Sequence, residues 1–148
     1  MKKADSRSGT GASQLTYLKA AIVLVKEENG FDGRFKDHAT LIRQSDGSWQ
    51  LEDARTGEKS VPKDNEPFIF VTMPDGQIRV RSKRQTGTGH PQVSGNAPYV
   101  RFAGEVIFRD GKEWRATPQS GTYLPPLEKA AEYSGFHCRF TKDFSGTE

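Results

Sequence analysis

The side chains that could support acid/base chemistry are concentrated between His90 and Pro126. His90 lies in a segment rich in Gly, Ser and Asn, and it is followed by Arg101 and Glu105 on a stretch of alternating residues. An imidazole titrates near neutral pH, so His90 is a candidate acid or base. This density of polar groups beside special turns predicts a functional site.

Glu105 lies on a predicted strand whose apolar side chains recur at every second position. The inward face of that strand carries Val100, Phe102, Gly104, Val106 and Phe108. Asp110-Gly111 follows, and this dipeptide is favoured in two-residue hairpin turns. The resulting register places Glu105 opposite Ala116. It also places Ile107 opposite Trp114.

Two interpretations of Glu105 remain open. With apolar neighbours on its face, the carboxyl would be partly desolvated, and burial raises the pKa of a carboxyl group. Alternatively, Glu105 pairs with Arg101 or Arg109 at the surface, which is a structural role.

A basic hairpin precedes this segment, and its turn is predicted at Asp75-Gly76. Alternation places three cations on one face, namely Arg79, Arg81 and Lys83. A two-residue turn would bring Phe70 opposite Arg81 and Thr72 opposite Arg79. Interleaved basic and aromatic side chains are typical of sheets that bind nucleic acid. The alternative is a solvated edge strand whose charges prevent aggregation.

The segment RQTGTGHPQVSGNAP, residues 84–98, is predicted to be a loop. Its glycines permit a backbone nest for an anion beside Ser94. It lacks the Lys-Ser/Thr pair of a phosphate-binding P-loop, so a simple mobile connection is the alternative.

The order of motifs in this region resembles the C-terminal domains of bacterial polymorphic toxins and effector-like proteins. The matching residues are His90, Ser94-Gly95, Ala103-Gly104-Glu105, Asp110-Gly111 and Ser120-Gly121-Thr122-Tyr123-Leu124-Pro125. The region is also similar to a segment of plant IQ-motif calmodulin-binding proteins. The toxin pattern has a Ser-Gly-His-Tyr-x-Pro turn, and Thr122 replaces its His here. If that His is catalytic in the toxins, this chain is altered or inactive.

Two classes of function follow. The resemblance implies a toxin-like enzyme, and the nearby basic residues suggest that its substrate bears phosphate, such as RNA or a nucleotide like NAD. In that hypothesis His90 and Glu105 supply acid/base groups, and Tyr123 supplies a positioning hydroxyl. The substrate-binding candidates are Arg79, Arg81, Lys83, Arg101, Ser94 and Ser120, with Arg101 as an anion clamp. Such a domain is expected to be secreted or delivered into the cytoplasm of a target cell.

The second class is a non-catalytic immunity, adaptor or inhibitor protein that docks a protein partner and resides in the cytoplasm. A net charge of +3 weakly favours an acidic partner. The sequence has no Cys/His cluster with zinc spacing, so no metal or other cofactor is expected. No apolar run is long enough to predict a membrane span.

The length of 148 residues fits one domain, assigned to residues 14–148 after a flexible arm at 1–13. A helix is predicted over residues 14–29, although its β-branched residues also suit a strand, and a short one begins at Pro126 and stops at Gly135. Three Asp-Gly hairpins and the stretch Phe136–Phe140 predict an antiparallel, twisted sheet of about seven strands. The fold class is therefore α+β with β dominant.

Three further segments complete the predicted layout. The first Asp-Gly hairpin turns at Asp46-Gly47, which would place Ile42 opposite Leu51 and Gln44 opposite Trp49. His38 lies in the charged loop before it and is expected to be solvated. Residues 54–67 are predicted to form a mobile connection.

Overall fold

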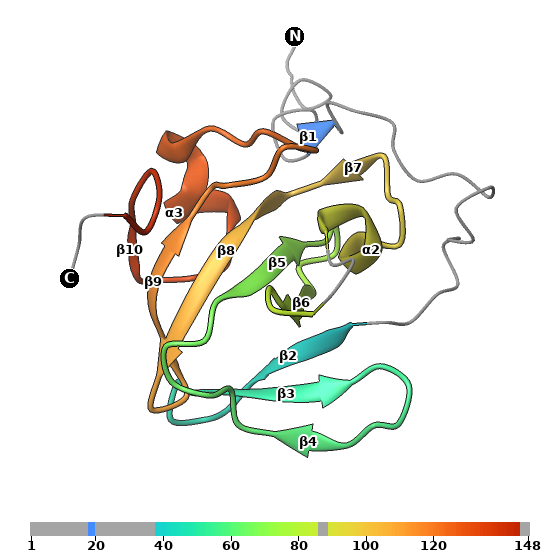
Figure 1. Ribbon diagram of the computed structural model, residues 1–148, viewed down its shortest axis with the longest axis vertical. Helices are drawn as coiled ribbons and strands as arrows, with labels where there is room; N and C mark the ends of the chain where they lie inside the picture. Colours follow the sequence, from blue (N-terminus) through green and yellow to red (C-terminus); the bar gives the residue numbers. More distant parts are fainter. Residues whose placement is uncertain (1–17, 20–37, 86–88, 146–148) are drawn as a thin grey trace, which may run out of the picture.

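A computed structural model describes residues 18–19, 38–85 and 89–145 of the chain. It shows a curled sheet of eight strands and a separate sheet of two (Figure 1). The order in the large sheet is β10 (Arg139–Phe140), β9 (Lys112–Thr117), β8 (Phe102–Arg109), β5 (Phe68–Thr72), β6 (Ile78–Ser82), β2 (Ala39–Arg43), β3 (Trp49–Asp53) and β4 (Lys59–Ser60). The small sheet pairs β1 (Leu18–Lys19) with β7 (Tyr99–Val100).

The prediction of a β-dominant α+β fold is confirmed, and the sheet is mostly antiparallel, but two predicted details were wrong: the number of strands, about seven, and a wholly antiparallel sheet. The large sheet has eight strands because β4 forms inside the predicted connection at 54–67. In addition, β10 runs parallel to β9, so the sheet is not wholly antiparallel.

The helices also differ from the prediction. At Leu18–Lys19, strand pairing with β7 prevails over the helical spacing of the sequence. The remainder of the helix predicted over 14–29 and the arm at 1–13 lie outside the described residues. An unpredicted helix, α2 (His90–Ser94), forms in the Gly-rich segment. Near the C-terminus, the 3₁₀ helix η2 (Leu127–Lys129) and α3 (Ala130–Tyr133) form the predicted short helix.

The sheet has an apolar cluster on each face. The larger one is rich in aromatic rings, with Phe136 packed edge-on against Phe70 and Phe108. The smaller one lies on the opposite face, where α2 contributes Val93 and the turn after β9 contributes Tyr123. Strand β5, which reads FIFVT, is buried along its whole length because it lies between both clusters.

The same Asp-Gly dipeptide forms two kinds of turn in this chain. At Asp110-Gly111 both residues have positive φ, 54° and 77°, which is the predicted two-residue loop. In the other two hairpins only the glycine, Gly47 or Gly76, has positive φ. Those hairpins have three-residue loops, closed by backbone bonds from Gln44 to Ser48 and from Met73 to Gln77, each 2.7 Å long.

One additional loop residue shifts the pairing of the two strands by one residue. Side chains that were predicted to share a face of the sheet therefore lie on opposite faces. Trp49 therefore pairs with Arg43, and Leu51 pairs with Leu41, so both pairs predicted for the first hairpin were wrong. In the second hairpin, Phe70 pairs with Val80. Thr72 pairs with Ile78 rather than with Arg79. The predicted interleaving of aromatic and basic side chains is thus absent from this hairpin, because Phe70 lies on the opposite face, in the larger cluster.

The β8–β9 pair departs from its predicted register at a β-bulge. Phe108 pairs with Glu113 as expected, but Ile107 pairs with Arg115, so Trp114 is the additional residue. Beyond the bulge Glu105 pairs with Thr117 instead of Ala116.

The strand itself is interrupted at Arg101. Val100 therefore packs in the smaller cluster, whereas Phe102 packs in the larger one. The prediction of one continuous inward face from Val100 to Phe108 was wrong at its first residue.

The curl brings the β8–β9 hairpin against the start of β3 (Figure 1). The amide of Trp49 donates to the carbonyl of Gly111 over 2.7 Å, and its indole nitrogen donates to Glu113 over 2.8 Å. These bonds hold distant parts of the chain together across the interior of the curl. Among the described residues, none of the helices has the length and apolar character needed to cross a membrane.

Candidate functional site

The predicted acid/base residue His90 is the first residue of α2, and it is only 7% exposed. Its Nε2 donates a hydrogen bond to the carbonyl oxygen of Gly104 over 2.9 Å. Burial lowers the pKa of His90 to about 4, and the positive charge of Lys83 acts in the same direction. At neutral pH the ring is therefore uncharged and serves as a bridge between α2 and β8.

Tyr123 is also held by internal hydrogen bonds. Its hydroxyl donates to the carbonyl of Ala97 over 2.6 Å and lies 2.9 Å from the hydroxyl of Ser94. Burial raises the pKa of Tyr123, so the phenol stays protonated. The Ser120 hydroxyl accepts the Tyr123 amide over 3.1 Å and fixes the turn that carries the ring. This network joins that turn to the end of α2.

Glu105 pairs with Lys83, with 3.0 Å between its Oε2 and the ammonium nitrogen. The side chain of Glu105 is 13% exposed, whereas that of Lys83 is 52% exposed. The partners suggested by the sequence, Arg101 and Arg109, were wrong. The pairing binds the Glu105 carboxyl group to the ammonium group of Lys83, which suits a structural role better than proton transfer.

The predicted cationic face is divided among separate contacts. Arg79 donates from Nη1 to the carbonyl of Ser94 over 3.3 Å, and burial lowers its pKa. Arg81 donates from Nε to the side chain of Gln85 over 3.0 Å. Arg101 lies at the interruption between β7 and β8, and its Nε is buried without a hydrogen-bond partner. These groups do not form one phosphate-tracking stripe.

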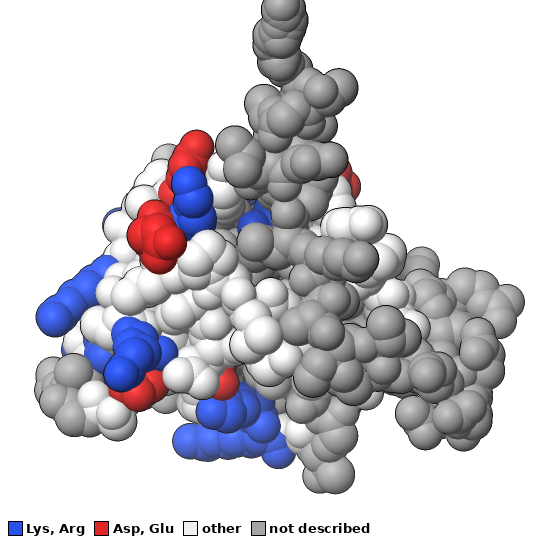
Figure 2. All heavy atoms as spheres, turned by 90° about the horizontal axis from the view of Figure 1, so that it is seen from above, with Lys and Arg blue, Asp and Glu red and all other residues white. Residues whose placement is uncertain are grey.

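Charged side chains of both signs are interspersed on one face of the molecule (Figure 2). On the face seen in Figure 2, Lys and Arg side chains form several separate groups, and Asp or Glu side chains lie beside or between them. Among the described residues on this face, the basic side chains do not form a continuous surface of the kind that follows a nucleic-acid backbone.

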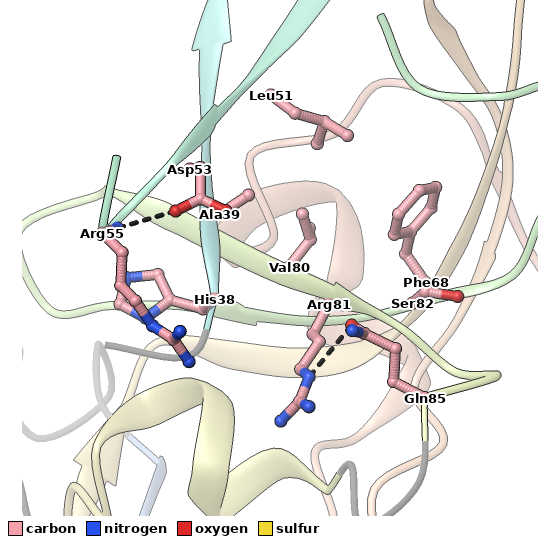
Figure 3. A pocket seen from close by; sticks show the side chains of 10 residues that line it. All are labelled: His38, Ala39, Leu51, Asp53, Arg55, Phe68, Val80, Arg81, Ser82 and Gln85. Atoms are coloured by element: carbon pink, nitrogen blue, oxygen red, sulfur yellow. Dashed lines mark hydrogen bonds between the residues drawn. The ribbon is translucent and has the colours of Figure 1, made fainter. Parts of the chain in front are cut away.

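A pocket lies elsewhere, at the ends of two hairpins opposite their turns (Figure 3). The pairing of Ala39 with Val80 places the start of β2 beside the end of β6, and the end of β3 and the start of β5 complete the wall. Its volume is about 400 Å³. The lining residues are His38, Ala39, Leu51, Asp53, Arg55, Phe68, Val80, Arg81, Ser82 and Gln85.

The pocket has an apolar and a polar side. In Figure 3, Leu51 and Phe68 lie on one side, and the side chains of His38, Arg55 and Arg81 lie on the other. His38 is half-buried rather than fully solvated as the sequence suggested. Most of the polar side chains come from residues just beyond the ends of the strands, namely His38, Arg55 and Gln85.

Asp53 has a defined structural role at the edge of this pocket. Its Oδ1 accepts the backbone amides of Arg55 and Thr56 over 2.8 and 3.0 Å, and these bonds lower the pKa of the carboxyl group. They also hold Arg55 in the turn after β3. The pocket therefore contains one fixed carboxylate among cationic and neutral polar groups.

Of the predicted site residues, only Arg81 lines this pocket. Ser94, Ser120, Tyr123 and Arg79 belong to the network around α2. His90 is bonded to the carbonyl of Gly104, and Glu105 is paired with Lys83. In the described part of the chain, no group of three or more His, Cys, Asp or Glu side chains is placed to hold a metal ion.

Sequence reasoning missed the contributions of Asp53, Arg55 and Gln85. Each lies in or beside a turn, where polar side chains are common for structural reasons. Their convergence depends on pairing between β2 and β6, which no local pattern reports. Comparison of the chain with protein-family models, with curated proteins and with solved structures gave no match.

Proposed function

We propose that this protein is a non-catalytic binding domain. The observation that carries the proposal is that all three predicted catalytic side chains are bonded to other groups within the fold. His90 is bonded to Gly104, Glu105 is paired with Lys83, and Tyr123 is bonded to Ala97. A general acid or base must reach a substrate proton, whereas these groups are committed to bonds within the fold.

The absence of the expected His from the turn that carries Tyr123 is consistent with this proposal. Thr122 occupies that position and is only 7% exposed. A threonine has no group that titrates near neutral pH, so it does not replace an imidazole in proton transfer. A site altered in this way can persist as a scaffold for binding.

The test is a direct search for turnover by the purified full chain. Wild type, His90→Asn and Tyr123→Phe would be incubated with RNA, NAD and nucleoside triphosphates, and products would be separated by chromatography. We expect no product above the buffer control from any of the three proteins. Product formed by wild type would contradict the proposal. Its loss in a folded His90→Asn variant would assign the activity to His90, and its retention there would assign the activity to another site.

A second candidate is the toxin-like enzyme acting on a phosphate-bearing substrate. The specific observation in its favour is the pocket, where the imidazole of His38 shares a wall with the guanidinium groups of Arg55 and Arg81. Such groups suit acid/base help and anion binding. In this case growth of a bacterial host should arrest on induction of wild type and recover with Arg81→Gln, but stay arrested with His90→Asn.

A further inference from the structure

The pocket between the two hairpins has the composition of a site for a small organic anion. We propose that it binds a nucleoside monophosphate, with the base against the apolar side and the phosphate at the arginines. This inference rests on the proposal that the protein is a binding domain and names the ligand class of that domain.

The apolar side provides a surface for a flat ring. Ala39 and Leu51 line the pocket, are half-buried and pack against the larger apolar cluster, to which the more deeply buried lining residues Phe68 and Val80 belong. Their positions are fixed by strand pairing, because Phe68 pairs with Ser82 and Leu51 pairs with both Leu41 and Ser60. A preformed apolar wall loses little conformational entropy when a ligand binds.

The polar side provides the charges that a phosphate needs. Arg55 and Arg81 come from different hairpins and lie on the same side of the view in Figure 3. A guanidinium group matches phosphate oxygens with two parallel donors, so two arginines favour a dianionic group over a neutral one. Lys or Arg alone on an open surface would not give this selectivity.

Asp53, Ser82 and Gln85 argue for a ligand that is polar along its length. A carboxylate held in a turn accepts hydrogen bonds from a sugar hydroxyl or an exocyclic amino group. The Oδ1 of Asp53 already accepts two backbone amides, but the charge of this carboxylate disfavours a hydrocarbon chain placed beside it. The lining therefore favours a nucleotide over a fatty acid.

The size of the pocket limits the ligand to one nucleotide. Its volume of about 400 Å³ lies near the lower end of the range of small-molecule pockets, roughly 300–1,000 Å³. A single base, sugar and phosphate fit a space of this order, whereas a dinucleotide such as NAD would extend outside it. RNA would bind only through one terminal or unpaired nucleotide.

Calorimetric titration of the full chain tests the inference. The probes are AMP, GMP, CMP and UMP, with adenosine, inorganic phosphate and decanoate titrated separately. We expect at least one nucleotide to bind at least about tenfold more tightly than adenosine or phosphate, since both parts of the ligand contribute. Binding that weakens as salt concentration rises is expected for the phosphate contact.

Three variants locate the binding. Arg55→Gln and Arg81→Gln should each weaken nucleotide binding by about tenfold or more. Arg84→Gln removes the same charge from an exposed residue that does not line the pocket, so its affinity should stay within about twofold of wild type. Circular dichroism and thermal melting of each variant establish that the fold is retained.

Each outcome decides the question. The inference is overturned if all four nucleotides fail to bind, if phosphate or decanoate binds as tightly as they do, or if Arg84→Gln weakens binding as much as Arg81→Gln. Hydrolysis of a bound nucleotide would instead overturn the proposed non-catalytic function and leave the ligand class intact. Phosphorus NMR of the same mixtures distinguishes hydrolysis from binding.

Discussion

At the scale of single residues, burial decides which role a reactive side chain has. His90 and Tyr123 are types that enzymes use, yet both are largely removed from solvent and bonded to backbone carbonyls. A neutral buried histidine costs free energy to protonate, so its contribution to stability depends on pH. The structural assignment of these residues can therefore be measured without knowing the ligand.

His90 should make the protein less stable as the pH falls from about 6.5 to 4. Above that window the ring is neutral in both states, and below it the ring is protonated in both. Inside the window the unfolded chain binds the proton more tightly because its pKa is near 6.5 and the folded pKa is about 4. The loss amounts to about 3 kcal/mol, and urea unfolding at several pH values measures it.

The matched variant for that measurement is His90→Asn. Other groups titrate in the same window, so the informative quantity is the difference in slope between wild type and variant. Equal slopes for the two proteins would contradict a buried, neutral His90.

Tyr123→Phe should destabilise the fold by about 1–3 kcal/mol without changing the affinity of the pocket. The variant keeps the ring but leaves the Ala97 carbonyl without its 2.6 Å donor. Thermal unfolding measures the effect, and Ser94→Ala in a double-mutant cycle reports the coupling of the two hydroxyls. No loss of stability, or a loss of ligand affinity, would contradict the structural assignment.

At the scale of elements, the sequence predicted the hairpins better than their registers. Alternation and Asp-Gly turns located the strands, because both are local properties. The choice between a two- and a three-residue loop at Asp75-Gly76 depends on the φ angle of Asp75, which residue type does not determine. The additional loop residue places Phe70 on the face of the sheet opposite Arg79 and Arg81. The predicted face of interleaved aromatic and basic side chains therefore does not form.

Gly104 is required where β8 approaches β9. A Cβ atom at this position would lie 1.8 Å from the carbonyl oxygen of Thr117, which is backbone and cannot rotate away. Gly104→Ala should therefore destabilise the protein by about 3 kcal/mol or more. Gly121→Ala is the control, since its Cβ would meet nothing within 4 Å. Similar melting temperatures for the two variants would refute the close approach of these strands.

At the scale of the whole molecule, the order of strands in the large sheet creates the candidate site. Asp53 and Arg81 are far apart in sequence and meet at one pocket only because β2 pairs with β6 and β3. No motif encodes that convergence, whereas the motifs around His90 and Tyr123 were visible because they are short. Local patterns therefore directed attention to an internal bonding network instead of the pocket.

Glu113 is expected to stabilise the curl. Its carboxylate accepts hydrogen bonds from the indole of Trp49 and the amide of His137, and Arg43 lies 3.8 Å away. Glu113→Ala should cost about 2–4 kcal/mol because these donors lose a buried acceptor. Urea unfolding compares it with Glu132→Ala, an exposed helical position expected to change stability by less than about 0.5 kcal/mol. Equal effects would show that Glu113 does not hold the curl.

The most direct test of the proposed binding site is to map the residues that a bound nucleotide contacts. Backbone amide NMR spectra of the ¹⁵N-labelled full chain would be recorded during titration with AMP and, separately, UMP. We expect shifts concentrated at Leu51, Phe68 and Val80, with the amides of His90 and Glu105 unchanged. Shifts centred on His90 and Glu105, or no shifts with either nucleotide, would contradict it.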